Sequence, residues 1–466
     1  MTARHRETGG LFAIAPLRNT NCSAGPLNFW EVSAMNSSKN DSSRPDVLII
    51  GGGPAGATAA AFLAMKGRDV VLVEKEAHPR FHIGESLLPR NLDIFERLGV
   101  LDQVREIGVH KPGAEFVSDR TGRSCAFPFG NALNRDRTHA WQVRRADFDA
   151  VLFKNAIARG AQCFERTRVT EVKLDDAGGR HVVSAQDESG GTREWHPRYV
   201  LDASGRDTFL ASRMKVKTSN KYNNTAAVYA HFTGVTRREG ELAGYISIHL
   251  AEDGWFWLIP LPGDIMSIGF VGNQSAWKER KGTPAELLTG RIASSPTVAA
   301  RVQGAQRVSD VYSTANYSYR AREGNGNGFL MIGDAYGFVD PMFSTGVLMA
   351  MTGGELGAEV AHVWLDDPAR GMKLAQAANK ELSEAMDRIS WLIYRVNDPV
   401  MRTLFMEPSN RLWMRDGVVN LLAGNLRGSW RAALPVMCFK AVYHVLSALH
   451  RRGVEISLPE MPAPGA

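Results

Sequence analysis

Cysteine is scarce in this chain of 466 residues. The four cysteines lie far apart, at Cys22, Cys125, Cys163 and Cys438, and no CxxC pair occurs. Zinc sites and dithiol redox motifs need closely spaced cysteines, so the sequence predicts neither, and we expect no bound metal. Cysteines that are few and widely separated fit a reducing cytoplasm.

Blocks of one charge and long apolar runs are also missing. The excess of basic over acidic residues is 55 − 49 = 6 and is scattered, so no nucleic-acid surface is predicted. No run of about 18 uncharged apolar residues occurs, and we expect no membrane-spanning helix. The nearest candidate, 432–449, contains Lys440 and His444. We interpret it as a helix docked on the body of the protein or, alternatively, on a membrane surface.

The two ends of the chain differ from its middle. Residues 1–44 have no long apolar run and are predicted to be a disordered extension, in which Met35 is the candidate true start. Residues 45–375 are predicted to form one core, with an inserted strand-rich region at about 110–135 and 165–275. Residues 376–466 read as a helical C-terminal region, and no internal repeat is found.

The strongest motif opens the core. A short apolar strand pattern at 46–50 is followed by a small-residue helix at 57–65 and a second strand at 70–73. Gly51, Gly53 and Gly56 form a GxGxxG pattern at the turn between the first strand and the helix. In this βαβ context the pattern predicts a dinucleotide-binding domain.

Each glycine has a separate function in that motif. Gly51 allows the tight turn, Gly53 lets backbone approach a pyrophosphate, and Gly56 lets helix pack on strand. Glu74 ends the second strand and is predicted to accept a hydrogen bond from a ribose hydroxyl, which fits FAD or NAD and disfavours a 2′-phosphate. The neighbouring residues Pro54, Ala55 and Lys75 are assigned to the same cofactor site.

Two later segments favour FAD over NAD. Residues 199–206 read as a strand that runs into a glycine turn, and 328–335 as a strand that ends in Gly-Asp-Ala before a glycine-bearing helix start. Asp334 is predicted to bind a ribityl hydroxyl, and the helix N-terminus favours anionic oxygen. The alternative for Asp334 is an ordinary helix cap.

Trp255 and Trp257 lie two residues apart, before Ile259 and Pro260. In a strand this spacing places both indoles on one face, and proline then ends hydrogen bonding on that edge. Two readings remain open. The indoles are core packing, or they form a barrier beside the flavin.

At this point the chain resembles the FAD-dependent halogenases, within the p-hydroxybenzoate-hydroxylase-like flavoproteins. The resemblance spans about 45–350 and rests on matching motifs: Gly51-x-Gly53-x-x-Gly56, Trp255-x-Trp257-x-Ile259-Pro260 and Phe338-x-x-Pro341-x-x-Ser344-x-Gly346. Segments 82–89 and 142–149 also look like family segments near the flavin, with Arg145 in place of the family arginine. The implied fold is α/β: a Rossmann-type FAD-binding domain, an antiparallel or mixed sheet region for the substrate, and a helical C-terminal region.

The resemblance implies a reaction and its participants. A separate flavin reductase supplies reduced FAD, and reduced FAD with oxygen turns chloride or bromide into hypohalous acid. The acid moves to a lysine, matched here to Lys111, and halogenates an electron-rich aromatic ring. The lysine acts as a hydrogen-bonding ammonium or as a chloramine, and a pKa lowered by burial would serve the second route. Taken alone, Lys111 reads as a solvated loop charge.

The resemblance also implies a halide site. The backbone N–H groups of Thr345 and Gly346, after Ser344, form a helix N-terminus that binds an anion, and Pro341 and Gly346 also contact the cofactor. Halogenases of free tryptophan have a glutamate two residues after this proline, whereas this chain has Phe343. The resemblance is therefore closer to phenol-type and carrier-protein-type halogenases, with a small aromatic substrate or its acyl carrier protein as partner.

Three other functions remain open at this stage. The first is a single-component FAD-dependent aromatic monooxygenase, which would bind NAD(P)H itself and admit substrate to the flavin. The second is a flavin-dependent reductase of prenyl or polyene chains, which would need a long apolar groove. The third is a flavoprotein with no halogenating activity.

Overall fold

The computed structural model describes residues 43–175, 177–220, 225–273, 277, 282–315, 318–426, 430–454 and 456. The predictions for the N-terminal extension and for a start at Met35 lie outside these residues.

A six-stranded sheet forms the centre of the dinucleotide-binding part, in the order β20-β21-β11-β1-β2-β7. β1, β2, β7, β11 and β21 pair in parallel, and β20 adds an antiparallel edge. β1, β2, β11 and β21 are buried at every position, as expected for a parallel sheet covered on both faces. The strands span Val47–Ile50 (β1), Val70–Val73 (β2), Gln162–Phe164 (β7), Tyr199–Asp202 (β11), Asn325–Gly326 (β20) and Phe329–Met331 (β21).

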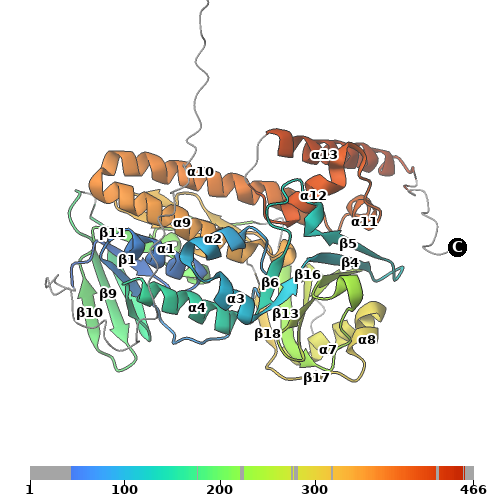
Figure 1. The fold of residues 1–466 in the computed structure, drawn as a ribbon, viewed down its shortest axis with the longest axis horizontal. Helices are drawn as coiled ribbons and strands as arrows, with labels where there is room; N and C mark the ends of the chain where they lie inside the picture. Colours follow the sequence, from blue (N-terminus) through green and yellow to red (C-terminus); the bar gives the residue numbers. More distant parts are fainter. Residues whose placement is uncertain are drawn as a thin grey trace, which may run out of the picture. The chain divides into compact units, whose positions relative to one another are not determined.

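Helices α1, α4, α9 and α10 pack in succession around this sheet, and α9 and α10 lie side by side (Figure 1). α1 and α9 approach closely because both have small residues at their contact. A Cβ at Gly354 of α9 would lie 2.4 Å from the carbonyl oxygen of Ala55. The helices of this part are α1 Pro54–Met65, α2 Asn91–Leu98, α3 Leu101–Glu106, α4 Arg145–Ala158, α5 Phe209–Arg213, α9 Thr345–Asp366 and α10 Pro368–Ile393. The Rossmann-type prediction is confirmed.

An eight-stranded sheet forms the second layer, in the order β17-β13-β16-β15-β14-β4-β5 with β18 added on β13. β14 and β4 pair in parallel and the other neighbours are antiparallel, so the predicted mixed sheet is confirmed. Its strands are β4 Gly113–Ser118, β5 Ser124–Pro128, β13 Thr225–Thr233, β14 Ile246–Ala251, β15 Gly254–Leu261, β16 Ile265–Asn273, β17 Gln306–Arg307 and β18 Tyr312–Ala315.

β15 holds the tryptophan pair in the middle of this sheet. Trp255, Trp257 and Ile259 alternate with Phe256 and Leu258, and the two sets belong to different hydrophobic clusters. Pairing with β14 ends at Leu258, before Pro260, whereas pairing with β16 continues to Leu261. The proline therefore stands beyond the ladder on one edge only.

Three smaller sheets complete the strands. Part of the predicted strand-rich insertion does not join the large sheet, because β8, β9 and β10 pair only with one another. The small-sheet strands are β3 Gly108–Lys111, β6 Ala140–Val143, β8 Thr167–Lys173, β9 Val182–Asp187, β10 Thr192–Trp195, β12 Lys217–Ser219, β19 Tyr319–Ala321 and β22 Gly337–Phe338. Two helices that the sequence pattern did not predict, α7 Pro284–Ser294 and α8 Pro296–Val302, cover the Phe256 side of β15.

The C-terminal part is helical, as predicted. It contains α11 Pro399–Met406, α12 Met414–Leu422 and α13 Trp430–His450 (Figure 1). α11 packs beside β4 and β5, and α13 packs on α11 and α12. Within α13, 432–450 is long and apolar enough to cross a membrane by length and composition, which is weak evidence and differs from the expectation of no spanning helix. α13 packs Phe439 and Tyr443 on Trp391 of α10, as a docked helix does. Short 3-10 helices occur at Phe129–Asn131 (η1), Gly205–Asp207 (η2), Gly240–Leu242 (η3), Gly333–Ala335 (η4), Pro341–Phe343 (η5) and Arg411–Trp413 (η6).

Candidate active site

A cavity of about 430 Å³ lies between the two large sheets. Most of the predicted cofactor residues line it: Gly51, Gly53, Pro54, Ala55, Glu74, Lys75, Arg145, Asp334, Pro341 and Gly346. Ser344, Trp255, Trp257 and Ile259 line the same cavity. Gly56, Thr345, Pro260 and Lys111 do not. Residues from the whole length of the core therefore meet around one space.

The glycine turn before α1 has the geometry of a phosphate-binding loop. Gly51 has φ +101° and a Cβ there would lie 2.4 Å from the carbonyl oxygen of Ala203, so only glycine fits. A Cβ at Gly56 would lie 1.9 Å from the carbonyl oxygen of Gly51, which explains why Gly56 is beneath the turn and not in the cavity. At Gly53 the space is open, with one arginine nitrogen of Arg80 at 3.6 Å. No side chain caps α1, so its first N–H groups can bind an anion.

Glu74 also has a structural function, which the sequence motif did not indicate. Its Oε2 accepts a hydrogen bond from Gly52 N at 2.7 Å, and its Oε1 accepts one from Glu76 N at 2.9 Å. The buried carboxylate thereby holds the glycine turn against the end of β2. It also faces the cavity, so the predicted acceptance from a ribose hydroxyl uses its remaining lone pairs. Lys75 is paired with Asp207 at the cavity margin.

The start of α9 is a second uncapped helix N-terminus at the cavity. Ser344 precedes the helix with φ +57°, and its side chain makes no capping hydrogen bond. No acidic residue occurs in the first turn of α9. Thr345 is 4% exposed and points away from the cavity, whereas Gly346 lines it beneath the ring of Phe338. Of the predicted halide residues, Ser344 and Gly346 therefore line the same cavity as the α1 turn, and Thr345 does not.

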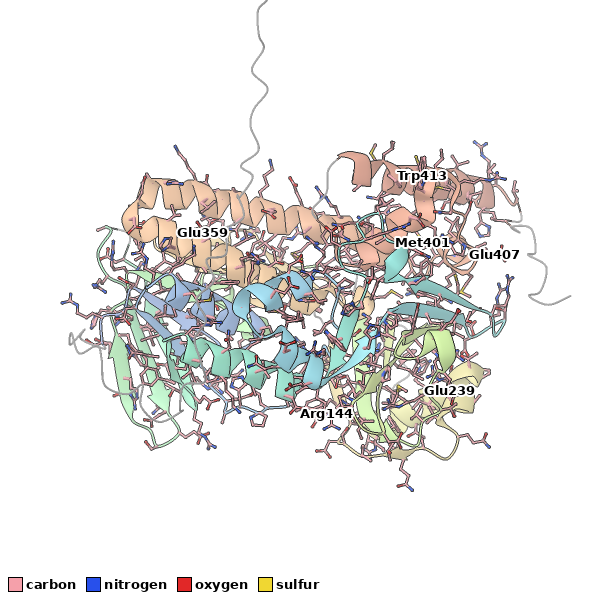
Figure 2. The ribbon with its side chains drawn as sticks, in the orientation of Figure 1. Arg144, Glu239, Glu359, Met401, Glu407 and Trp413 are labelled. Carbon is pink, nitrogen blue, oxygen red and sulfur yellow. The ribbon has the colours of Figure 1, made fainter. Side chains whose placement is uncertain are left out.

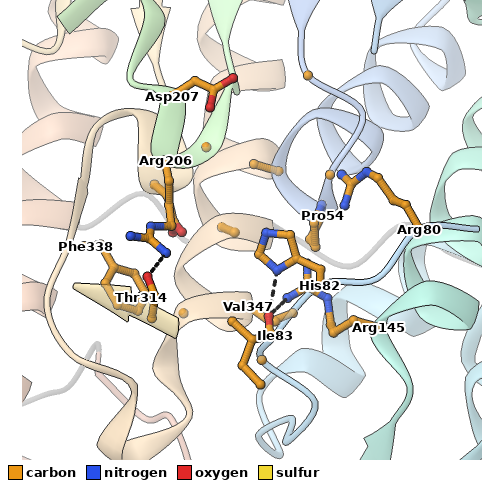
Figure 3. Close-up of a pocket in the computed structure, with 18 of the residues that line it drawn as sticks. Pro54, Arg80, His82, Ile83, Arg145, Arg206, Asp207, Thr314, Phe338 and Val347 are labelled. Atoms are coloured by element: carbon orange, nitrogen blue, oxygen red, sulfur yellow. Dashed lines mark hydrogen bonds between the residues drawn. The ribbon is translucent and has the colours of Figure 1, made fainter. Parts of the chain in front are cut away.

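Arg145 lies on one side of the cavity, beside His82 and Ile83 (Figure 3), and an ion pair with Asp149 fixes its guanidinium. Its guanidinium donates to Asp149 at 2.8 and 3.0 Å and to the carbonyl oxygen of Ile83 at 2.6 Å. His82 Nδ1 donates to the same carbonyl at 2.7 Å. Burial and the charge of Arg145 lower the pKa of His82 to about 4, so this imidazole is neutral at pH 7.

Asp334 lies in η4, at the end of β21. Burial raises the pKa of its carboxyl to about 6, and its backbone carbonyl accepts from the hydroxyl of Tyr319 at 2.8 Å. No side-chain capping bond is present at η4, so the alternative of a plain helix cap is not supported there. A hydroxyl group that donates to Asp334 would stabilise the ionised carboxylate.

Trp255 and Trp257 form one wall of the cavity, which we call the tryptophan wall. Their ring centroids are 5.9 Å apart, and Trp257 Nε1 donates to Ser267 Oγ at 3.2 Å. A Cβ at Gly269 on β16 would lie 2.2 Å from the Trp257 ring, so glycine at this position creates the space for the indole. Pro260 faces the other side of β15 and takes no part in the wall.

Lys111 is fully buried at the end of β3. Its Nζ donates to the carbonyl oxygen of Leu87 at 2.8 Å and lies 5.2 Å from the centroid of the Phe129 ring. Burial lowers its pKa to about 7. The reading of Lys111 as a solvated loop charge is therefore wrong. Leu87 follows Glu85 and Ser86, which line the cavity, so one short segment contacts both the cavity and the amine.

Phe343 stands where halogenases of free tryptophan have a glutamate. It belongs to an aromatic cluster formed by Phe116, Phe127, Phe343 and Phe405. Phe343 stacks on Phe405 at a centroid distance of 6.2 Å, and Phe405 lies 5.0 Å from Phe116 and 5.6 Å from Phe127. Phe405 belongs to α11, so the C-terminal helices close this region. It is an apolar environment with no place for a carboxylate.

Several cavity residues were not selected from the sequence. They include Arg80, His82, Glu85, Arg206, Tyr229 and Thr314. Arg206 donates to Thr314 Oγ1 across the cavity mouth (Figure 3). Glu85 accepts from His231 Nε2 through Oε1 at 2.6 Å, while its Oε2 is buried with no hydrogen-bond partner among the described residues. The glycine turn at 203–206 and the resemblance at 82–89 were the available signals.

These residues fit FAD. Two uncapped helix N-termini suit a pyrophosphate and a second anion, Glu74 and Asp334 suit hydroxyl groups, and Glu85 Oε2 is a buried acceptor in need of a donor. The wall of indole and aliphatic side chains suits a planar ring. No group of three or more His, Cys, Asp or Glu side chains could hold a metal ion within the described part of the chain.

Comparison with known proteins shows that the chain has an FAD-binding domain. The family model described as "FAD binding domain" matches residues 44–364. A flavin-dependent halogenase of Armillaria mellea is 36% identical over 328 residues, which cover 66% of this chain and 62% of that protein. A brominase of 1H-pyrrole-2-carbonyl peptidyl-carrier protein from Pseudoalteromonas luteoviolacea is 30% identical over 390 residues, 81% of this chain and 91% of that protein.

The fold agrees as well. The crystal structure of a flavoprotein/dehydrogenase from Cytophaga hutchinsonii superposes with a TM-score of 0.79 at 27% identity, over 87% of this chain and 99% of that chain. The chain spans only 60 to 65% of the length of three of the curated relatives it matches.

Proposed function

The chain belongs to the flavin-dependent halogenases, within the FAD-binding-domain family, and on that premise we propose that it halogenates an electron-rich aromatic substrate. Reduced FAD, when bound, supplies the electrons with which oxygen converts chloride or bromide into hypohalous acid. We propose that FAD is held by Gly51, Gly53, Glu74, Arg145 and Asp334.

One observation favours this function over hydroxylation. The tryptophan wall and the α9 turn line one cavity with the glycine loop, while a lysine is buried behind the cavity-lining segment 85–86. Indoles packed at the flavin leave little room for an aromatic substrate beside it. A halide is small enough to bind at the N–H groups of Thr345 and Gly346. Those groups bind without a charged side chain, so the anion keeps its nucleophilicity.

Lys111 is the proposed catalytic residue. A pKa of about 7 leaves a substantial fraction of the amine neutral at physiological pH. A neutral amine can attack the halogen of hypohalous acid, so that an N–halogen bond forms, the halogen–oxygen bond breaks and water leaves. The protonated fraction can instead donate a hydrogen bond to the oxygen of hypohalous acid and make it a better leaving group. Both routes need an amine shielded from water, which the burial of Lys111 provides.

The aromatic cluster beside Phe343 supports a substrate that activates its own ring. A phenol or a pyrrole needs no carboxylate to raise its reactivity, so the absence of glutamate at this turn is tolerated. We propose a phenolic or carrier-protein-bound acyl substrate from natural-product or pigment biosynthesis. The Pseudoalteromonas relative is named for a carrier-bound pyrrole, which makes a carrier protein a reasonable second partner.

We also propose a separate flavin reductase as a transient partner, because the sequence has one glycine-rich dinucleotide loop and that loop serves FAD. The described cysteines Cys125, Cys163 and Cys438 are free thiols, which suits a reducing compartment such as the cytoplasm.

The decisive experiment supplies reduced FAD, oxygen, and chloride or bromide to the purified protein. Free phenols and aryl thioesters on a carrier protein are offered in parallel, and products are analysed by mass spectrometry. A halogen isotope pattern in either product supports the proposal. Fast NADPH oxidation without added reductase, stimulated by substrate and giving a hydroxylated product, would instead identify a single-component monooxygenase. Reduction of a prenyl or polyene chain, without need for halide, would identify a flavin-dependent reductase.

A further inference from the structure

α13 exposes a stripe of apolar side chains on the side that faces away from the protein body. This outward face consists of Leu434, Met437, Ala441, Val445, Ala448 and Leu449, all exposed. The exposed fraction is 53% for Leu434, 62% for Met437 and 59% for Val445. Spacings of three and four residues along a helix place them on one face. A helix of a globular protein normally turns such a face toward its core.

The opposite face of α13 is already packed. Phe439 and Tyr443 are buried, and their ring centroids lie 6.4 and 5.4 Å from that of Trp391. Pro435 of α13 is also buried, and it lies so close to α12 that a Cβ added at Gly417 would contact it. Rotation of α13 to bury its outward face would therefore expose these aromatic rings. The exposed stripe is a property of the docked helix.

Two further large apolar side chains lie beside α13. Leu412 is 63% exposed and Trp413 is 64% exposed, both in η6. Trp413 lies next to α13 in Figure 2, and η6 contacts α13. Both residues have φ +54°, an uncommon conformation for a bulky side chain. Indole side chains favour the boundary between water and lipid, because they combine a large apolar surface with one N–H donor.

The charge of this segment is of one sign. Between Trp430 and Val454 the sequence contains no Asp or Glu, and its basic residues are Arg431, Lys440, Arg451 and Arg452. Lys440 lies on one flank of the outward face, where its ammonium is 4.7 Å from the centroid of the Trp391 ring. Arg451 and Arg452 follow the end of the helix. A helix with an apolar face and basic residues at its margin is attracted to a membrane surface that contains anionic lipid.

We infer that the outward face of α13, together with Leu412 and Trp413, docks on the surface of a bilayer containing anionic lipid. α13 lies in the plane of that surface and does not cross it, because Phe439 and Tyr443 hold its inner face on the protein. A second copy of the chain fits less well, because two basic margins would then oppose each other. An acidic carrier protein would be bound through basic side chains within the contact, and the middle of this face has none. The inference does not depend on the proposed halogenase activity.

The test measures co-sedimentation of the full chain with vesicles of phosphatidylcholine alone and of equal parts phosphatidylcholine and phosphatidylglycerol. We expect binding to the anionic vesicles that weakens with salt. The double variant Met437→Glu and Val445→Glu should lower the vesicle affinity at least about tenfold, because two side chains can no longer enter the lipid. Replacing Arg451 and Arg452 with Gln should weaken binding about fivefold for each charge, on anionic vesicles only.

A matched control makes the same change elsewhere. Met65 and Ile157 are 46% and 49% exposed on other helices, so M65E/I157E adds two glutamates to exposed apolar positions away from α13. This control should bind vesicles like the unmodified chain. Absence of binding by the unmodified chain, or unchanged binding of M437E/V445E, overturns the inference. The inference is also overturned if the unmodified chain binds no lipid but forms a dimer, or a complex with an acidic carrier protein, that M437E/V445E abolishes.

Discussion

The cofactor cavity and the surroundings of Lys111 are built on opposite principles. The cavity is open and lined by backbone groups, charged side chains and two indoles. Lys111 is enclosed, and its ammonium contacts the carbonyl oxygen of Leu87 and the ring of Phe129. A nucleotide needs many hydrogen bonds at fixed positions, so its site is prepared by glycines and helix termini. An amine that is neutral part of the time needs burial and few polar partners, because burial disfavours its charged form. The following variants test that contrast, from the largest expected effect to the smallest.

The largest effect is expected from Lys111→Met. Halogenated product should fall at least about a thousandfold, while FAD affinity stays unchanged because Lys111 does not line the cavity. Lys154→Met, an exposed lysine on α4, is the control. Mass spectrometry and flavin titration measure the two quantities. Product that persists in the variant would show that Lys111 is not the relay.

The same variant has a predicted effect on stability. The folded pKa of about 7 lies below that of an unfolded lysine, about 10.4, so the unfolded chain binds more protons between these pH values. The contribution of Lys111 to the free energy of unfolding therefore rises with pH through this window and is least favourable below it. Lys111→Met should raise stability by about 1 to 3 kcal/mol at pH 7 in urea unfolding, and the gain should shrink toward pH 10.

A substitution in the glycine turn should have the opposite pattern of effects to Lys111→Met, because it should weaken FAD binding and leave Lys111 unchanged. In Gly56→Ala the new methyl group meets the Gly51 carbonyl oxygen at 1.9 Å, so α1 must move away from the turn. We expect FAD affinity to fall about a hundredfold while the pKa-dependent stability slope from Lys111 remains. Gly290→Ala, where a Cβ meets nothing within 4 Å, is the control. Equal FAD affinity in both variants would contradict the geometry of the turn.

The pH dependence of FAD binding tests Asp334. Its pKa of about 6 in the free protein should fall when a ligand hydroxyl donates to the carboxylate, so binding releases a proton. FAD affinity should then be constant above about pH 7 and decrease about tenfold by pH 5. Asp334→Asn should bind more weakly, with a flatter profile. An identical profile in both proteins would exclude Asp334 from the contact.

The smallest effect is expected at the tryptophan wall, which lines the cavity from β15. In Gly269→Ala the added methyl lies 2.2 Å from the Trp257 ring, which must tilt. We expect a loss of about 1 to 3 kcal/mol in stability and less halogenated product per oxygen consumed, with FAD affinity changed less than threefold. Indole fluorescence and product yield measure both, with Gly290→Ala again as control. Unchanged coupling would mean that the tryptophan wall is only core.

The cofactor side could be predicted from the sequence because its determinants are local. Gly51, Gly53 and Gly56 are required by one turn, and Glu74 ends the next strand. α7 and α8 were missed although Thr283 and Glu286 form a capping box and Ser295 caps the following helix. The strands β8–β10 were assigned to the wrong sheet, because alternation predicts a strand but not its partner.

The sequence by itself determined the dinucleotide-binding motif, the tryptophan pair and the family to which the chain belongs, since these depend on residues that are close along the chain. Only the tertiary structure decided that Lys111 is buried and loses its charge near pH 7, that Gly269 makes room for Trp257, and that α13 leaves an apolar face exposed. The physical reason is desolvation and close packing, which depend on segments far apart in sequence. Lys111 is buried with Leu87 and Phe129, and the aromatic cluster is completed by Phe405, almost three hundred residues after Lys111.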